Sequence, residues 1–93
     1  MIKLRARLKL YKGDAKRKTA FISGYRPLFD VLSDTLTSGM ITLLDRTEMQ
    51  PGDEAVVEIK LLEGNCSEGE KFHFFESSEP LGEVVVLDIL DKQ

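Results

Sequence analysis

The sequence predicts an all-β fold, a barrel or a sandwich of short strands, in a single domain covering residues 1–93. Apolar and polar residues alternate with a period of two in several segments, which is the pattern of half-buried strands. Turn residues separate these segments at intervals of about 8–12 residues, as in small barrels and sandwiches. The chain is 42% hydrophobic and 31% charged, which is typical of one small folded domain.

The first predicted strand covers residues 2–11 and has two contrasting faces. Its apolar face consists of Ile2, Leu4, Ala6, Leu8 and Leu10. Its other face consists of Lys3, Arg5, Arg7, Lys9 and Tyr11. We call the four cations of that face the basic stripe. The alternation predicts that the apolar face packs on the core and that the basic stripe faces outward.

Further strands are predicted along the rest of the chain. A turn signal at residues 12–16 precedes them, and Pro27 predicts a bend because proline restricts the residue before it. Pro51-Gly52-Asp53 predicts a tight turn, since proline presets the first corner and glycine permits a positive φ at the second. The predicted strands are Ala20–Gly24, Leu28–Leu32, Gly39–Leu44, Ala55–Leu62, Lys71–Phe75 and Glu83–Leu90.

Charge is divided unevenly along the chain. Residues 1–26 hold nine lysines and arginines against one acid, whereas residues 27–93 hold four against fifteen. Such a division either steers a charged partner or is neutralised when oppositely charged strands become neighbours. No apolar run approaches the ~20 residues of a membrane span, and the amino terminus lacks the apolar stretch of a signal peptide. With Cys66 as the single cysteine, we expect a cytoplasmic protein with no membrane contact.

Several segments resemble the third, carboxy-terminal domain of elongation factor Tu. Residues 17–29, RKTAFISGYRPLF, are similar to the family's Arg-His-Thr-Pro-Phe-Phe-x-Gly-Tyr-Arg-Pro-Gln-Phe, and Met49–Asp53 is similar to its Met-Pro-Gly-Asp. Gly69–Phe72 and Leu81–Val85 resemble its Gly-Leu-Arg-Phe and Val-Gly-x-Gly-Val-Val segments. Order and spacing agree, with one-residue slips, over nearly the whole chain. The resemblance implies a small Greek-key barrel of about six strands.

In that family the domain performs no chemistry. The resemblance implies that it packs on a GTPase domain, helps to bind the T stem of aminoacyl-tRNA and contacts a nucleotide-exchange factor. Arg17 and Lys18 match the family's tRNA-facing Arg-His pair, but Glu63 and Glu79 stand where the family has basic residues. A carboxylate repels phosphate, so both reversals oppose RNA binding. The stretch from Gly64 to Phe72 is not a phosphate-binding P-loop, because its lysine is one position late and no hydroxyl follows.

The basic stripe, extended by Arg17 and Lys18, is a candidate surface for an acidic protein or for RNA. Two structural alternatives remain open. The stripe is either an edge strand on which lysines prevent aggregation, or it pairs with Glu58 or with the acids of Glu83–Asp88 on neighbouring strands.

The loop Gly24-Tyr25-Arg26-Pro27 is a second candidate contact, because its family counterpart lies near domain interfaces. Its structural alternative is a rigid turn in which the tyrosine packs over the barrel end. Arg26 is the member that structure alone explains least.

Neither catalysis nor a cofactor is expected. Cys66 and His73 have no clustered ligand spacing for zinc, and we interpret them as a loop thiol and a lone surface histidine. The acids after residue 26 are read as a solvated face, with no insertion that forms a cleft.

The function hypothesis is therefore a stand-alone interaction module that presents its first strand and Tyr25-Arg26 to an acidic protein surface. The candidate partners are a translation GTPase, a related factor, or a toxin against which a mimic of elongation factor Tu serves as decoy or immunity protein. The alternative is an RNA- or tRNA-binding module that uses the basic first strand. A third possibility is a degenerate fragment with no binding role.

Overall fold

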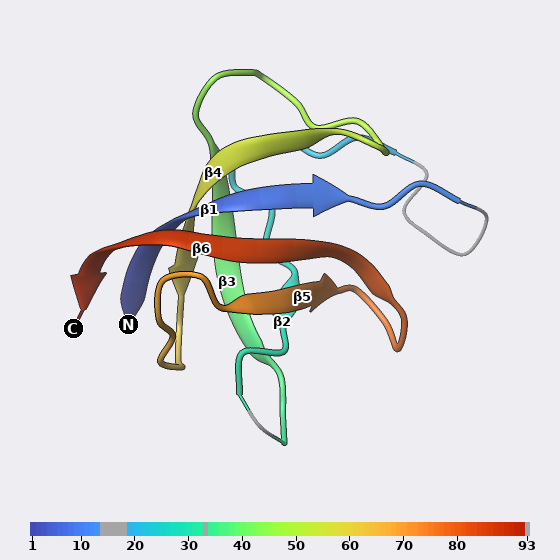
Figure 1. The fold of residues 1–93 in the computed structure, drawn as a ribbon. Coiled ribbons are helices and arrows are strands. Elements are labelled where there is room, and N and C mark those ends of the chain that lie inside the picture. Colours follow the sequence, from blue (N-terminus) through green and yellow to red (C-terminus); the bar gives the residue numbers. More distant parts are fainter. Residues whose placement is uncertain (14–18, 33, 93) are drawn as a thin grey trace.

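Six antiparallel strands form a closed barrel in the computed structural model, which describes residues 1–13, 19–32 and 34–92. In chain order they are β1 (Ile2–Leu10), β2 (Leu28–Phe29), β3 (Thr37–Leu43), β4 (Glu54–Leu61), β5 (Lys71–Phe75) and β6 (Pro80–Lys92). The order around the barrel is β1-β4-β3-β2-β5-β6, and β6 pairs back onto β1 (Figure 1). The prediction of a small all-β barrel of about six strands is confirmed. Across the described residues, no helix has the length and apolar character needed to cross a membrane.

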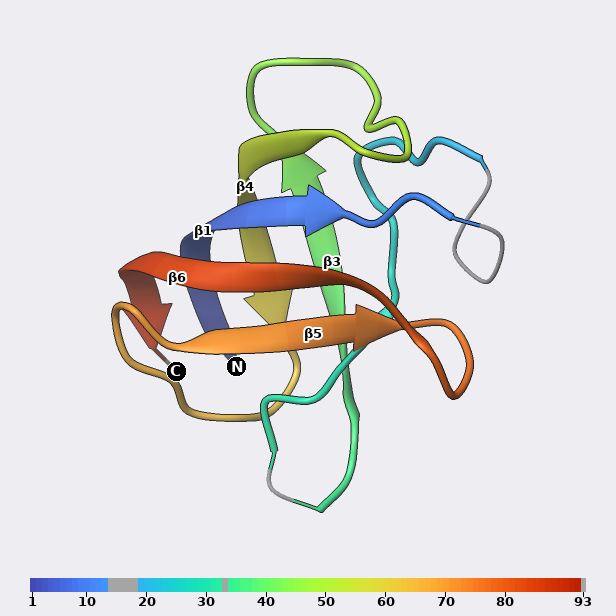
Figure 2. The same cartoon turned by 45° about the vertical axis from the view of Figure 1, so that its right-hand side comes forward.

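The first strand lies in the middle of a continuous surface. β4, β1, β6 and β5 follow one another side by side, and β3 crosses behind them (Figures 1 and 2). β1 pairs with β4 along one edge and with β6 along the other. The edge-strand alternative for the basic stripe is therefore wrong. Both chain ends lie close together, because Ile2 pairs with Lys92.

The core fills the barrel interior as the alternation predicts. All five apolar residues of β1 are at most 2% exposed. Phe29, Phe72 and Phe74 meet inside, with the Phe29 ring 5.9 Å from Phe72 and 6.3 Å from Phe74. Burying each such side chain contributes about 1.5–3 kcal/mol. The inward positions of all six strands thus explain the fold, and their outward positions remain available for function.

Two irregularities in β6 change which of its residues face outward. The β1–β6 register shifts between Arg5 and Ala6 and again between Lys3 and Leu4. Val86 faces the core opposite Ala6, and regular alternation would place Asp88 on the same inner face. The extra residue of the first bulge instead puts Asp88 opposite Arg5 on the outer face, and the second puts Asp91 opposite Lys3.

The strand predicted at Ala20–Gly24 is absent. Phe21 and Tyr25 form only isolated bridges, to Met49 and Ile41 respectively. Gly24 separates them with a φ of 97°, so the backbone turns between two different partners instead of extending along one.

The strand predicted at Leu28–Leu32 is reduced to the two residues of β2. The physical reason lies in Asp30, whose carboxylate accepts a hydrogen bond from the backbone N–H of His73 at 2.5 Å. A side chain here takes a ladder position that a longer strand would have filled with backbone.

Candidate partner-binding surface

The basic stripe lies between two rows of carboxylates. On the β4 side, Lys3 Nζ lies 3.1 Å from Glu58 Oε1, and Arg7 Nη1 lies 3.8 Å from Glu54 Oε1. On the β6 side, Arg5 forms an ion pair with Asp88, the residue that the bulge turns outward. The pairing alternative is therefore confirmed for Lys3 and Arg5, and it extends to Arg7.

The carboxy-terminal end of β1 is also tied to an acid. Lys9 is in register with Glu54 on β4 and with Glu83 on β6. The Tyr11 hydroxyl donates to Glu83 Oε1 at 2.8 Å, and Lys71 of β5 lies 3.3 Å from Glu83 Oε2. The hydrogen bond from Tyr11, together with the charge of Lys71, lowers the pKa of Glu83. Burial of the hydroxyl and the neighbouring Glu83 raise the pKa of Tyr11 to about 12.

These pairs change what the stripe offers to a partner. Each cation of a half-exposed pair already has an anion beside it, so a phosphate or carboxylate from outside must compete with that anion. The field above β1 is correspondingly weaker than four free cations would create. The stripe is best described as a neutralised charge lattice across β4, β1 and β6.

Tyr25 is held by packing at one end of the barrel. Its ring stacks on Phe21 at 4.4 Å with an interplanar angle of 27°, and it meets Phe74 edge-on at 6.4 Å. The backbone of Ile41 donates to the Tyr25 carbonyl at 2.9 Å, and Gly24 donates to Ile41 at 2.9 Å. The structural alternative for this loop therefore accounts for Tyr25 by itself.

Arg26 differs from its neighbour because it is exposed. The Tyr25 carbonyl accepts from the Ile41 N–H, and the Pro27 carbonyl accepts from the Gly39 N–H at 3.3 Å. Arg26 lies between Tyr25 and Pro27, and it therefore lies beside Met40, which lies between Gly39 and Ile41. Within the described part of the chain, no carboxylate lies within ion-pair distance of Arg26. The bond pattern thus places a cation without an ion-pair partner, among the described residues, next to β3.

A hollow of about 340 Å³ opens beside Arg26. Its walls come from the amino terminus, the Tyr25–Pro27 loop, β3 and the end of β4. We call it the β3–β4 groove, and its lining includes Met1, Arg26, Ser38, Met40, Lys60 and Leu62. Met1 and Leu62 are 51% and 57% exposed, so the groove combines cations with accessible apolar side chains.

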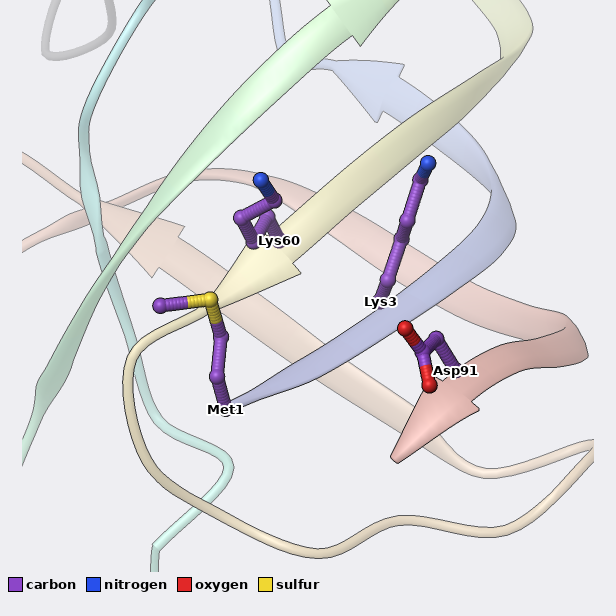
Figure 3. A pocket seen from close by; sticks show the side chains of 4 residues that line it. All are labelled: Met1, Lys3, Lys60 and Asp91. Carbon is purple, nitrogen blue, oxygen red and sulfur yellow. The ribbon is translucent and has the colours of Figure 1, made fainter. Parts of the chain in front are cut away.

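A smaller hollow of about 140 Å³ adjoins the groove and shares Met1 and Lys60 with it. Figure 3 shows Lys60 and Lys3 rising from neighbouring strands, with Asp91 beside Lys3 and the Met1 side chain pointing toward the end of β4. Lys3 and Lys60 are direct partners in the β1–β4 register. Like charges in directly opposite positions repel, and the carboxylate of Glu58 beside Lys3 offsets part of this repulsion.

Lys3 and Lys60 differ in whether an acidic side chain pairs with them. Lys3 is paired with Glu58, but over the described ranges no acid lies within 4 Å of the Lys60 ammonium. Lys60 also faces Met40 on β3. A row across the barrel surface therefore runs Lys3, Lys60, Met40, Arg26, and its last two cations have no carboxylate partner among the residues that the structure describes.

Other predicted residues fall outside this groove. Arg17 and Lys18 lie outside the described residues. Glu63 and Glu79 are exposed. Cys66 lies in the loop between β4 and β5, as predicted, but it is only 5% exposed, and burial raises the pKa of its thiol.

His73 is not a lone surface histidine. It is half-buried, and its Nδ1 lies 3.2 Å from Asp30 Oδ2. Where the structure describes the chain, no group of three or more histidine, cysteine or acidic side chains is arranged to hold a metal ion.

Sequence reasoning missed Met1, Met40, Lys60 and Leu62. The period-two pattern places Met40 and Lys60 on outer faces, but nothing in the chain says that β3 and β4 set them side by side. The chain matches no model of a known protein family.

Proposed function

We propose that this protein is a non-catalytic interaction module that binds an acidic protein partner. The observation that supports it is the β3–β4 groove, where Arg26 and Lys60 have no carboxylate partner within the described residues and lie beside exposed Met1 and Leu62. Aromatic residues, methionine and arginine are enriched at protein interfaces, and methionine adapts to varied partners. A surface that mixes such apolar side chains with unpaired cations suits an acidic protein.

The resemblance to the third domain of elongation factor Tu supports the same proposal, because that domain acts by docking and not by chemistry. We therefore propose a cytoplasmic partner linked to translation, such as a translation GTPase or one of its partners. A decoy or immunity role against a toxin that targets elongation factor Tu is a form of the same activity.

RNA binding through the basic stripe is the competing function. The ion pairs of Lys3, Arg5 and Arg7 with β4 and β6 count against it, because phosphates would have to displace those carboxylates. The aromatic rings also count against it. Phe21, Phe29, Phe72 and Phe74 are buried and Tyr25 is stacked on Phe21, so these rings are not available to bases.

The test is affinity capture with the purified protein, with and without ribonuclease, followed by purification and titration of the captured protein. We expect an acidic protein that binds directly and withstands ribonuclease. Fluorescence anisotropy of labelled bulk tRNA is the matched measurement, and we expect no binding at low salt. Capture that ribonuclease abolishes would overturn the proposal. So would tRNA binding with a log–log salt slope of roughly −4, the value for six phosphate contacts on a single strand.

A further inference from the structure

We propose that the β3–β4 groove binds an extended acidic peptide segment in which an apolar side chain lies between two carboxylates. This inference rests on the proposed function, and it names the site and the chemistry of the occupant.

The geometry of the row determines the pattern. Lys60 and Arg26 lie on either side of Met40, on three neighbouring backbone segments. Adjacent strands are about 4.8 Å apart, so the two cations arise about 10 Å from each other. In an extended peptide, residues two apart share a face at a spacing of about 7 Å. Three such residues place one carboxylate near each cation and an apolar side chain over Met40, because lysine and arginine side chains reach several ångströms outward.

Recognition here depends on side chains, because the nearby backbone groups are already used. The Leu62 N–H donates to the Ser38 carbonyl at 3.0 Å, and the Gly39 N–H donates to the Pro27 carbonyl at 3.3 Å. The occupant therefore does not add a strand to β3. Charge complementarity provides orientation, while Met1, Met40 and Leu62 provide apolar contact.

A peptide fits this groove better than nucleic acid does. Among the described residues, the lining of the groove contains no aromatic side chain on which a base could stack. Beside the two cations it presents the thioethers of Met1 and Met40 and the aliphatic side chain of Leu62, together with Ser38 and Gly39. An apolar anchor flanked by acids satisfies both kinds of group, whereas a phosphate backbone satisfies only the cations.

The three methionines can report separately on the groove and on the core. Met1 and Met40 line the groove, whereas Met49 is 0% exposed in the core. The protein is labelled with ¹³C at its methionine methyl groups and titrated with the blocked peptide Ser-Glu-Ser-Leu-Ser-Glu-Ser. We expect saturable movement of the Met1 and Met40 signals and an unchanged Met49 signal. Peptides with glutamine for glutamate, or alanine for leucine, are expected to bind more weakly.

Two double variants separate the groove from the stripe. R26Q/K60Q removes the two groove cations, and R5Q/R7Q removes two paired cations of the stripe, so both change the net charge equally. We expect about tenfold weaker peptide binding for R26Q/K60Q and less than about twofold for R5Q/R7Q. An unchanged Met49 signal in each variant verifies the fold.

Specific outcomes overturn the inference. The inference is wrong if the glutamine peptide binds as tightly as the glutamate peptide, or if both double variants lose the same peptide affinity. It is also wrong if the Met1 and Met40 signals do not move with peptide, or if tRNA moves them more than the peptide does. Failure of the proposed function is distinguishable. If a captured acidic protein binds R26Q/K60Q as tightly as the unaltered chain, the groove is not the binding site, but the proposed interaction function is upheld. If the peptide binds as expected but no protein is captured, the groove is upheld as a peptide site, but the proposed interaction function is not.

Discussion

The outer faces of β1 and of the β3–β4 groove carry the same kinds of side chain in opposite electrostatic settings. On β1, Lys3, Arg5 and Arg7 each face a carboxylate supplied by a neighbouring strand. In the groove, Lys60 faces a lysine on one side and a methionine on the other. The segment richest in positive charge is therefore the more neutral surface. A basic strand says little about binding until its neighbours are known, because the field depends on what lies about 5 Å to each side.

The largest effect on this comparison should come from Gly82, which brings β6 close to β1 and β5. A Cβ here would lie 2.2 Å from the Lys9 carbonyl oxygen and 2.4 Å from Cε1 of Phe74. Gly82→Ala should therefore separate the strands and lower the free energy of unfolding by about 3 kcal/mol or more. Urea denaturation followed by circular dichroism measures it.

Gly69→Ala is the matched control. Gly69 lies just before β5 and has a φ of 85°, and a Cβ there would meet no other heavy atom within 4 Å. Only the backbone conformation is strained at this position, so we expect a cost of about 1 kcal/mol. Equal losses at the two glycines would contradict the close approach of β6 to β1.

The next effect compares one charge reversal in each region. Arg5→Glu places a carboxylate in register with Glu58 and Asp88, and it should destabilise the fold by about 1 kcal/mol. Lys60→Glu places a carboxylate opposite Lys3, and it should leave stability unchanged or raise it by about 0.5 kcal/mol. Urea denaturation measures both changes. A lower free energy of unfolding for Arg5→Glu, with an unchanged or higher one for Lys60→Glu, would support the distinction between paired and unpaired cations.

A double variant sharpens that test. Arg5→Glu combined with Asp88→Arg restores one opposite-charge pair across β1 and β6, so it should recover part of the loss. If the double variant is as unstable as the sum of its single changes, the Arg5–Asp88 pair makes no contribution.

The smallest effect concerns pH at the end of the stripe. Burial and Glu83 raise the pKa of Tyr11 to about 12, above the value of about 10 in an unfolded chain. The contribution of the protonated hydroxyl is therefore complete below pH 10 and is lost as pH rises toward 12. The pKa of Glu83 is lowered from its ordinary 4.5, so its contribution is present above that pH and is lost as pH falls through the folded value.

Tyr11→Phe tests both limbs at once. The variant should be less stable by about 1 kcal/mol near neutral pH, and the difference should shrink in strong acid and strong base. Urea denaturation across pH measures it, and a difference that does not vary with pH would contradict the Tyr11–Glu83 hydrogen bond.

The sequence alone determined the inside of this molecule. Alternation in residues 2–11 identified every core residue of β1, because a side chain's face follows from its position along a strand. The predicted segment Lys71–Phe75 coincides with β5, and Gly39–Leu44 and Ala55–Leu62 overlap most of β3 and β4. The strand predicted at Ala20–Gly24 is absent, and the strand predicted at Leu28–Leu32 has only two residues. At these places the turn at Gly24 and the Asp30 side chain interrupt the regular backbone hydrogen bonds between strands.

Only the tertiary structure decided the outside. Whether a cation meets an acid depends on strand order and register, and these join residues as distant in sequence as Arg5 and Asp88. The first bulge of β6 turns Asp88 outward, and the second keeps Asp91 outward opposite Lys3, which no period-two pattern reveals. The neighbourhood of Met1, Arg26, Met40 and Lys60 likewise exists only after the barrel closes, since four separate segments supply it. Local alternation settles which side chains are buried, but the long-range pairing of strands settles which charges remain unpaired.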